Sequence, residues 1–172
     1  MPSPFEIVSA SVIAFLAASV LSSLLAGNQT FLINSSSALS AIASLLALCG
    51  GFTSVLAGGT ETSILPIGLP DLPFYMRLDP VSGFFIAVTG LLGFFVSVYS
   101  AGYLKGFLGR RSVTPLLVFY NIFMAGMLLV LLSDDAYFFM ISWELMAASS
   151  FFLTCFEDDR IRNRRAAFIY IL

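Results

Sequence analysis

The sequence contains no histidine, only two cysteines and few charges. Charged residues make up 10% of the 172 positions, and Cys49 and Cys155 do not form a Cys-x-x-Cys pair. The ligand patterns typical of zinc, haem and iron–sulfur sites are therefore missing, and we expect no cofactor. Hydrophobic residues reach 59% and the mean hydropathy is +0.97. A soluble globular domain is not expected to have this composition.

Long apolar runs fill most of the chain. A helix needs about 20 apolar residues to cross the roughly 30 Å hydrocarbon core of a bilayer. Uncharged stretches of about this length recur, so we predict an all-α membrane protein with five complete transmembrane helices and the start of a sixth. The last segment is much too short to span, and we therefore expect one N-terminal transmembrane fragment, residues 1–172. The predicted helices cover residues 4–26, 38–57, 80–104, 115–132, 136–156 and, truncated, 166–172.

Capping residues indicate where several of these helices begin. Ser3 and Glu6 flank Pro4 in a capping-box pattern, and Asp79 precedes Pro80 as an N-cap. Thr114 is the predicted cap before the helix that starts at 115. The longest connection, 58–78, contains three prolines and is predicted to be an extended surface loop with a short strand-like piece around 64–69.

The positive charges predict the orientation of the chain in the membrane. Short cytoplasmic loops carry an excess of lysine and arginine. Arg77 lies alone on one side of the predicted membrane, so we expect the other side to be cytoplasmic and the N-terminus to be outside. The location that follows is multi-pass in the inner (plasma) membrane. The other side holds Lys105, Arg110, Arg111, Arg160, Arg162, Arg164 and Arg165.

Glu144 is the one acidic residue predicted to lie deep in a span. It comes about eight residues, or roughly 12 Å, into the fifth helix. A charge at this depth costs roughly 2.5 to 3.5 kcal/mol, and such residues commonly mark an ion or proton path. An apolar medium favours the neutral carboxyl group and a nearby cation favours the charged form, so a glutamate whose cationic partner moves can bind and release a proton. The alternative is a protonated glutamate that only hydrogen-bonds a neighbouring helix.

A helical wheel predicts which side chains share the face of Glu144. The small side chains of Ala147 and Ala148 leave room beside the carboxylate for water or a partner side chain. Ser142 and Ser149 lie on the opposite face, where we expect them to bond carbonyl groups of their own helix rather than relay protons. The residues predicted to line the Glu144 face are Tyr137, Met140, Ala147 and Ala148, with Ile141, Phe151 and Cys155.

Two runs of sequence resemble a known superfamily. FYMRLDPVSGFF, followed by VFYNIFMAGMLLVLLSDDAYFFMISWELMAASSFFLTCFEDD, is similar to the beginning of the proton-translocating membrane subunits of complex I, Mrp-type antiporters and membrane-bound hydrogenases. Within this superfamily, the chain is similar to the subunits of the hydrogenase-4 and formate-hydrogenlyase type. The resemblance covers residues 74–172. It implies that Glu144 matches a glutamate that pairs with a lysine in a later, broken helix, and that this pair gates proton movement.

The resemblance implies a non-redox subunit that couples electron transfer in other subunits to proton movement. Its partners would be the bilayer and the other membrane and peripheral subunits of a respiratory or hydrogenase complex, with no nucleic acid involved. Two alternatives remain open. The chain could belong to a cation/proton antiporter of the Mrp type, or it could be a membrane anchor or truncated product that translocates nothing.

Overall fold

The computed structural model describes residues 2–69, 72–109 and 111–157. These residues form five helices that are long and apolar enough to cross a membrane, which confirms the predicted all-α membrane class. The predicted sixth segment, 166–172, and the arginines at 160–165 lie outside the described residues. The helices are α1 (Pro4–Leu24), α2 (Gln29–Ala57), α3 (Pro80–Tyr103), α4 (Thr114–Leu132) and α5 (Ala136–Thr154), with short 3-10 turns at Leu104–Phe107 and Cys155–Glu157.

Two of the three predicted helix caps are confirmed. Ser3 and Glu6 form the full capping box at the start of α1. Asp79 accepts the backbone N–H of Ser82 at 2.8 Å at the start of α3. The prediction for Thr114 is wrong, because Thr114 is already the first residue of α4 and Val113 is its cap. The Val113 N–H donates instead to the Gln29 side chain of α2, at 3.0 Å.

Helix α2 starts at Gln29, so the predicted start at residue 38 is wrong. The polar residues from 28 to 37 resemble a loop in sequence, but they form helix because the bundle supplies partners for them. Asn28 caps the helix by accepting the Phe31 N–H at 3.1 Å. With 29 residues, α2 is about 43 Å long, so it extends beyond the hydrocarbon core or tilts within it.

The connection from α2 to α3 is a β-hairpin, and the prediction of a surface loop with one short strand is incomplete. Strand β1 (Glu61–Leu69) pairs antiparallel with β2 (Leu72–Leu78), with an irregular register between Leu65 and Gly68. The second strand shows the period of two expected of a half-buried strand. Met76 and Leu78 are buried, whereas Tyr75 and Arg77 are exposed.

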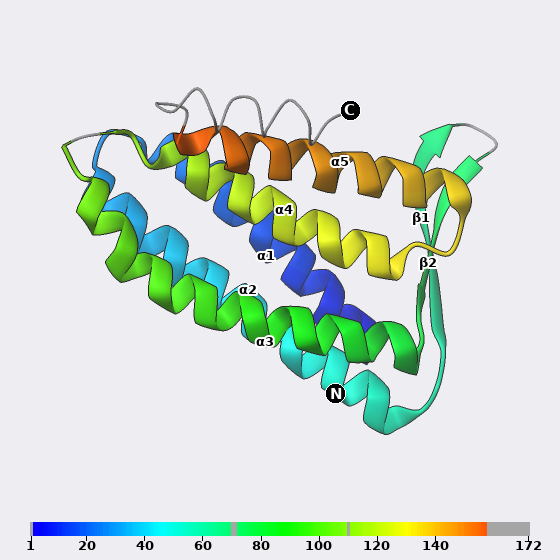
Figure 1. Ribbon diagram of the computed structural model, residues 1–172. Helices are drawn as coiled ribbons and strands as arrows, with labels where there is room; N and C mark the ends of the chain where they lie inside the picture. Colours follow the sequence, from blue (N-terminus) through cyan, green and yellow to red (C-terminus); the bar gives the residue numbers. More distant parts are fainter. Residues whose placement is uncertain (1, 70–71, 110, 158–172) are drawn as a thin grey trace.

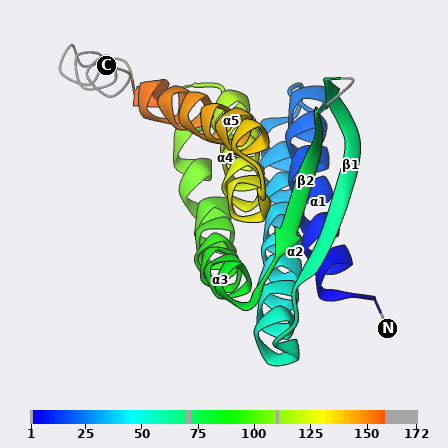
Figure 2. The same ribbon diagram turned by 90° about the vertical axis from the view of Figure 1, so that its right-hand side faces the viewer.

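The helices pack in a fixed neighbour pattern, with α2 between α1 and α3, and α4 between α1 and α5. Helix α5 therefore lies at the edge of the bundle, as Figure 1 shows. The hairpin lies across one end of the bundle, beside the starts of α3 and α5 (Figures 1 and 2). The buried core runs from Val8 and Phe15 of α1 through α4 to Phe138 of α5.

Small residues allow α2 and α3 to approach closely. A Cβ atom added to Gly90 would lie 2.5 Å from the backbone nitrogen of Leu48, and one added to Gly51 would lie 2.5 Å from the carbonyl oxygen of Gly83. Both contacts are with backbone atoms, which cannot move without separating the helices. Packing through small residues is a common basis of helix association in membranes.

We predict that Gly90→Ala destabilises the bundle by about 1–3 kcal/mol, because the added methyl group forces α2 and α3 apart. The measurement is thermal unfolding of the purified protein in detergent. Gly102→Ala in the same helix is the matched control, since a Cβ there meets no atom within 4 Å. Equal melting temperatures for the two variants would contradict the close packing.

Candidate functional site

Helix α5 carries the candidate site, and its start is fixed by two aspartates. Asp135 is the N-cap and accepts the N–H of Phe138 at 2.7 Å. Its second carboxylate oxygen accepts the N–H of Tyr75 in β2 at 2.9 Å. The Asp134 N–H donates to the Tyr75 carbonyl at 3.0 Å. The hairpin therefore holds the start of α5 in place.

Glu144 lies on the outer side of α5. Its side chain is exposed, and so are those of its neighbours Tyr137, Met140 and Ala148, while Ala147 is half-buried. Helix α5 is the least buried of the five helices. In its membrane-spanning window 17% of the residues are buried, against 28–39% in the other four helices. The structure thus gathers the predicted lining residues on one face, but the described part of the chain leaves that face uncovered.

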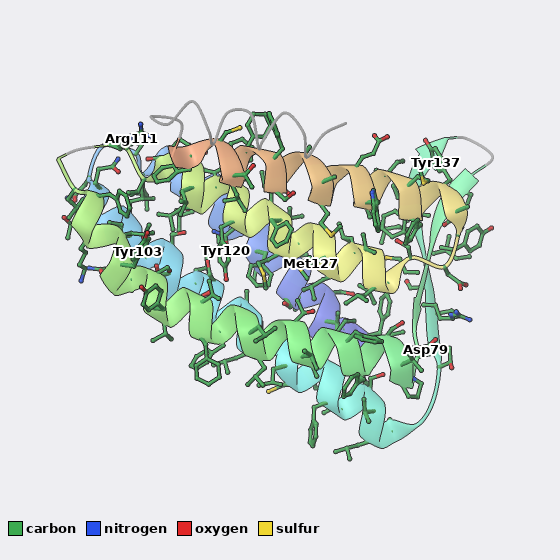
Figure 3. The ribbon with its side chains drawn as sticks, in the orientation of Figure 1. Asp79, Tyr103, Arg111, Tyr120, Met127 and Tyr137 are labelled. Atoms are coloured by element: carbon green, nitrogen blue, oxygen red, sulfur yellow. The ribbon has the colours of Figure 1, made fainter. Side chains whose placement is uncertain are left out.

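The Tyr137 ring marks the hairpin end of this face. It lies against Phe74 of β2, with ring centroids 5.8 Å apart, and Figure 3 shows it beside the hairpin. Glu144 lies two helical turns further along, near the middle of a helix about 28 Å long. An exposed carboxylate at that depth would face hydrocarbon if nothing covered it, at a cost of roughly 2.5 to 3.5 kcal/mol. The outer face of α5 is therefore suited to contact with protein rather than lipid.

The two serines on the opposite side of α5 differ. Ser149 donates to the carbonyl groups of Leu145 and Met146 at 2.8 and 2.9 Å, as predicted. The same prediction for Ser142 is wrong. Its hydroxyl is buried and has no hydrogen-bond partner among the described residues.

A buried polar network, absent from the predictions made from sequence, lies at the centre of the bundle. The Asn121 carboxamide of α4 accepts the Ser40 hydroxyl at 2.7 Å and donates to the Ser36 hydroxyl at 3.4 Å, both in α2. Ser36 also accepts the hydroxyl of Ser22 in α1, at 2.8 Å. The network joins three helices. An asparagine in an apolar span, together with serines four residues apart in 36, 40 and 44, was the available signal.

A second polar contact joins α4 to α3. The Tyr120 hydroxyl donates to the carbonyl of Gly93 and lies 3.2 Å from the Ser97 hydroxyl. Figure 3 shows the Tyr120 ring between these two helices. None of the hydroxyl and amide groups in the two networks carries a charge, so they serve to join helices. Glu144 is not part of either network.

Charged groups gather at the ends of the bundle. Arg77 of β2 contacts Asp134 at 3.0 Å and Asp79 at 3.8 Å. This contact brings together the RLD run and the SDD run, which are 54 or more positions apart in sequence. The N–H of Ser82 at the start of α3 lowers the pKa of Asp79 below its usual value, and Arg77 adds to the effect. Lys105 and Arg111 lie toward the other end, where Arg111 donates to the Phe156 carbonyl (Figure 3).

No family model matches the chain. Among curated proteins, hydrogenase-4 component B of Escherichia coli (strain K12) is 31% identical over 157 residues, which are 90% of this chain and 23% of that protein. A protein of Staphylococcus aureus named as antiporter subunit mnhA2 is 36% identical over 94 residues, 54% of this chain and 11% of that protein. The chain belongs to the proton-translocating membrane subunit superfamily. The resemblance found in the sequence is thereby confirmed.

The chain matches only part of the length of each relative. An uncharacterised protein of Mycobacterium tuberculosis is 37% identical over 105 residues, 59% of this chain and 16% of that protein. The chain thus spans about a quarter or less of the length of these relatives. It is a multi-pass membrane protein that is similar to membrane subunits of a hydrogenase or an Mrp-type antiporter family. The names of two relatives, a component and a subunit, describe parts of larger assemblies.

We predict that Arg77 and Asp134 stabilise the hairpin end of the bundle jointly, by up to about 1 kcal/mol because both side chains are partly exposed. A double-mutant cycle with Arg77→Gln and Asp134→Asn measures this coupling from unfolding in detergent. The coupling should decrease at high salt, which screens exposed charges. Strictly additive effects of the two substitutions at low salt would show that the contact stabilises nothing.

Proposed function

We propose that this chain forms part of a proton-translocating membrane subunit of a hydrogenase-4-like, formate-hydrogenlyase-like or complex-I-like respiratory complex. Electron transfer in other subunits would drive proton movement, and Glu144 would carry the proton. The observation that supports this role is the position of Glu144, a carboxylate near the middle of a span on a helix face that α1–α4 leave open. Glutamate at such a depth is rare unless it has a function.

The chemistry that we assign to Glu144 is the binding and release of one proton. In an apolar environment the carboxyl group favours its neutral form, and a cation nearby favours the carboxylate. We propose that a cationic side chain, which the resemblance identifies as a lysine, approaches Glu144 from a helix that covers the outer face of α5. Movement of that cation toward or away from Glu144 would then release or load the proton. Tyr137, Met140, Ala147 and Ala148 would border the space in which this happens.

The same proposal includes the setting of the subunit. We place it in the inner (plasma) membrane, with the hairpin end outside and the end with Lys105 and Arg111 in the cytoplasm. The charges of the described residues support this orientation, because Arg77 at the hairpin end is held by Asp79 and Asp134. Other membrane and peripheral subunits of the complex are the proposed partners.

A second candidate function is that of a cation/proton antiporter subunit of the Mrp type. The similarity to the protein named as antiporter subunit mnhA2, at 36% identity, favours it. The residue that carries the proton would again be Glu144. The two candidates differ in the source of energy, which is electron transfer in the first and a cation gradient in the second.

We predict that Glu144→Gln abolishes proton uptake, because glutamine keeps the size of the side chain but cannot bind and release a proton. The measurement uses inverted membrane vesicles containing the intact protein and its complex, with a pH-sensitive dye. Uptake that requires an electron donor supports the respiratory subunit, whereas uptake driven by a cation gradient alone supports the antiporter.

The matched control is Glu157→Gln, the same substitution in the 3-10 turn that follows α5. We expect this variant to pump as the wild type does. Glu144→Gln should also reach wild-type amounts in the membrane, which separates a loss of titration from a loss of assembly. Undiminished uptake by Glu144→Gln would refute the proton-carrying role and leave Glu144 as a packing residue.

A further inference from the structure

Helix α3 turns a wide apolar face away from the bundle. It lies at the other edge of the bundle from α5 and packs mainly against α2 (Figure 1). In its membrane-spanning window only 28% of the residues are buried. We call this surface the α3 outer face and define it as the exposed apolar residues between Val81 and Tyr103, among them Phe84, Leu92 and Tyr99.

Polar and small side chains are confined to the opposite side of α3. Over residues 83–97 the exposed side chains are all phenylalanine, leucine or valine. Helices in membranes ordinarily associate through small and polar residues, whereas lipid tails are as apolar as leucine. The composition of the α3 outer face therefore favours lipid, in contrast to the Glu144 face of α5. Within 83–97 the glycine, serine and threonine residues, all buried, are Gly83, Thr89, Gly90, Gly93 and Ser97.

The length of the α3 outer face matches a bilayer. Its apolar part runs from Val81 to Tyr99, 18 residues or about 27 Å, close to the roughly 30 Å hydrocarbon core. Asp79 precedes it at the hairpin end, and Tyr103 lies at the other end of α3 (Figure 3). The Tyr99 and Tyr103 rings stack with centroids 5.5 Å apart and are both exposed. Tyrosines concentrate at the level of lipid headgroups, so this pair marks where the hydrocarbon ends.

A lysine without an acidic partner follows the two tyrosines. Lys105 lies in the 3-10 turn Leu104–Phe107 that continues α3, and it is exposed. Both ion pairs among the described residues involve Arg77, so none of these residues neutralises Lys105. A Cβ atom added to Gly102 or Gly106 would meet nothing within 4 Å, so the space beside the lysine is open. A lysine at the end of a span extends its amine toward the headgroup layer, where the complementary charge is a phosphate.

We propose that the α3 outer face contacts lipid, and that Lys105 binds the phosphate of an anionic phospholipid at the end of α3 away from the hairpin. The acyl chains of this lipid lie along the α3 outer face, and its glycerol backbone lies at the level of Tyr99 and Tyr103. The site is far from Glu144 in the bundle and does not depend on the proposed function.

The test uses p-benzoylphenylalanine, which on illumination bonds to C–H groups of whatever lipid or protein lies beside it. The label replaces Gly102, an exposed position that leaves both tyrosines and Lys105 in place. The intact protein is reconstituted in equimolar phosphatidylglycerol and phosphatidylcholine with the same acyl chains, and mass spectrometry identifies the captured molecule. We expect captured lipid, with phosphatidylglycerol about five-fold over phosphatidylcholine, the preference expected of one lysine near the bilayer surface.

Two variants of Lys105 locate the selectivity. With the label at 102, Lys105→Gln should lower the ratio of the two captured lipids to about one, because glutamine carries no charge. Lys105→Arg keeps the charge and should keep the preference. Equal capture of the two lipids by the wild-type lysine, or an unchanged preference in Lys105→Gln, would each overturn the headgroup site.

A label at Phe84 is the matched control in the opposite leaflet, about 27 Å along the same face. It should also capture lipid, but in a ratio near one, because Arg77 at that end already contacts Asp79 and Asp134. Tyr99→p-benzoylphenylalanine keeps an aromatic ring at an exposed position and repeats the test if the label at 102 disturbs folding. Capture of peptide instead of lipid at these positions would show that protein covers the α3 outer face and would overturn the proposal.

Discussion

In the hydrocarbon core of a bilayer no water is present to satisfy a polar group, and this constraint determines where the polar side chains of this protein lie. Inside the bundle, Asn121 and Ser36 satisfy each other and their neighbours across three helices. At the hairpin end, Arg77 contacts Asp79 and Asp134, just before the starts of α3 and α5. Many serines follow a third pattern and donate to a carbonyl group of their own helix, as Ser44, Ser97 and Ser149 do.

Helix α5 departs from these patterns twice. Glu144 is exposed on its outer face near the middle of the span, and Ser142 is buried without a partner on its other side. The other helices are covered more fully, so both departures fall on the helix with the least protein around it. The exposed face of α5 is suited to contact with another part of the protein, which we propose to be a cation-bearing helix.

The sequence predicted the parts of the fold that depend on apolar run length and local capping. The five spans, the Ser3 capping box and the Asp79 cap are confirmed because each is determined by residues close together in the chain. The early start of α2 was missed because its polar residues are supported by other helices, as when Gln29 accepts the Val113 N–H. The second strand of the hairpin was missed because Pro73 lies near its start, and prolines that follow an apolar run ordinarily indicate a loop.

The candidate site was also predicted only in those features that residues close together in sequence determine. Depth in a span identified Glu144, and helical periodicity placed Tyr137, Met140, Ala147 and Ala148 on its face. The direction in which that face points could not be predicted, because it depends on which side of α5 packs against α4. The Asn121 network likewise depends on neighbouring helices that periodicity within one helix does not reveal.

The central claim is that protein covers the outer face of α5 in the membrane. The most direct measurement is the oxygen accessibility of a nitroxide attached to Ala148→Cys in the intact protein, with Cys49 and Cys155 replaced. A nitroxide at Leu92→Cys on α3 is the reference for a lipid-facing site, since Leu92 is 61% exposed. We expect markedly lower oxygen accessibility at 148 than at 92, because a protein helix over the outer face of α5 excludes lipid. Equal accessibility at the two positions would show that lipid, not protein, covers Glu144.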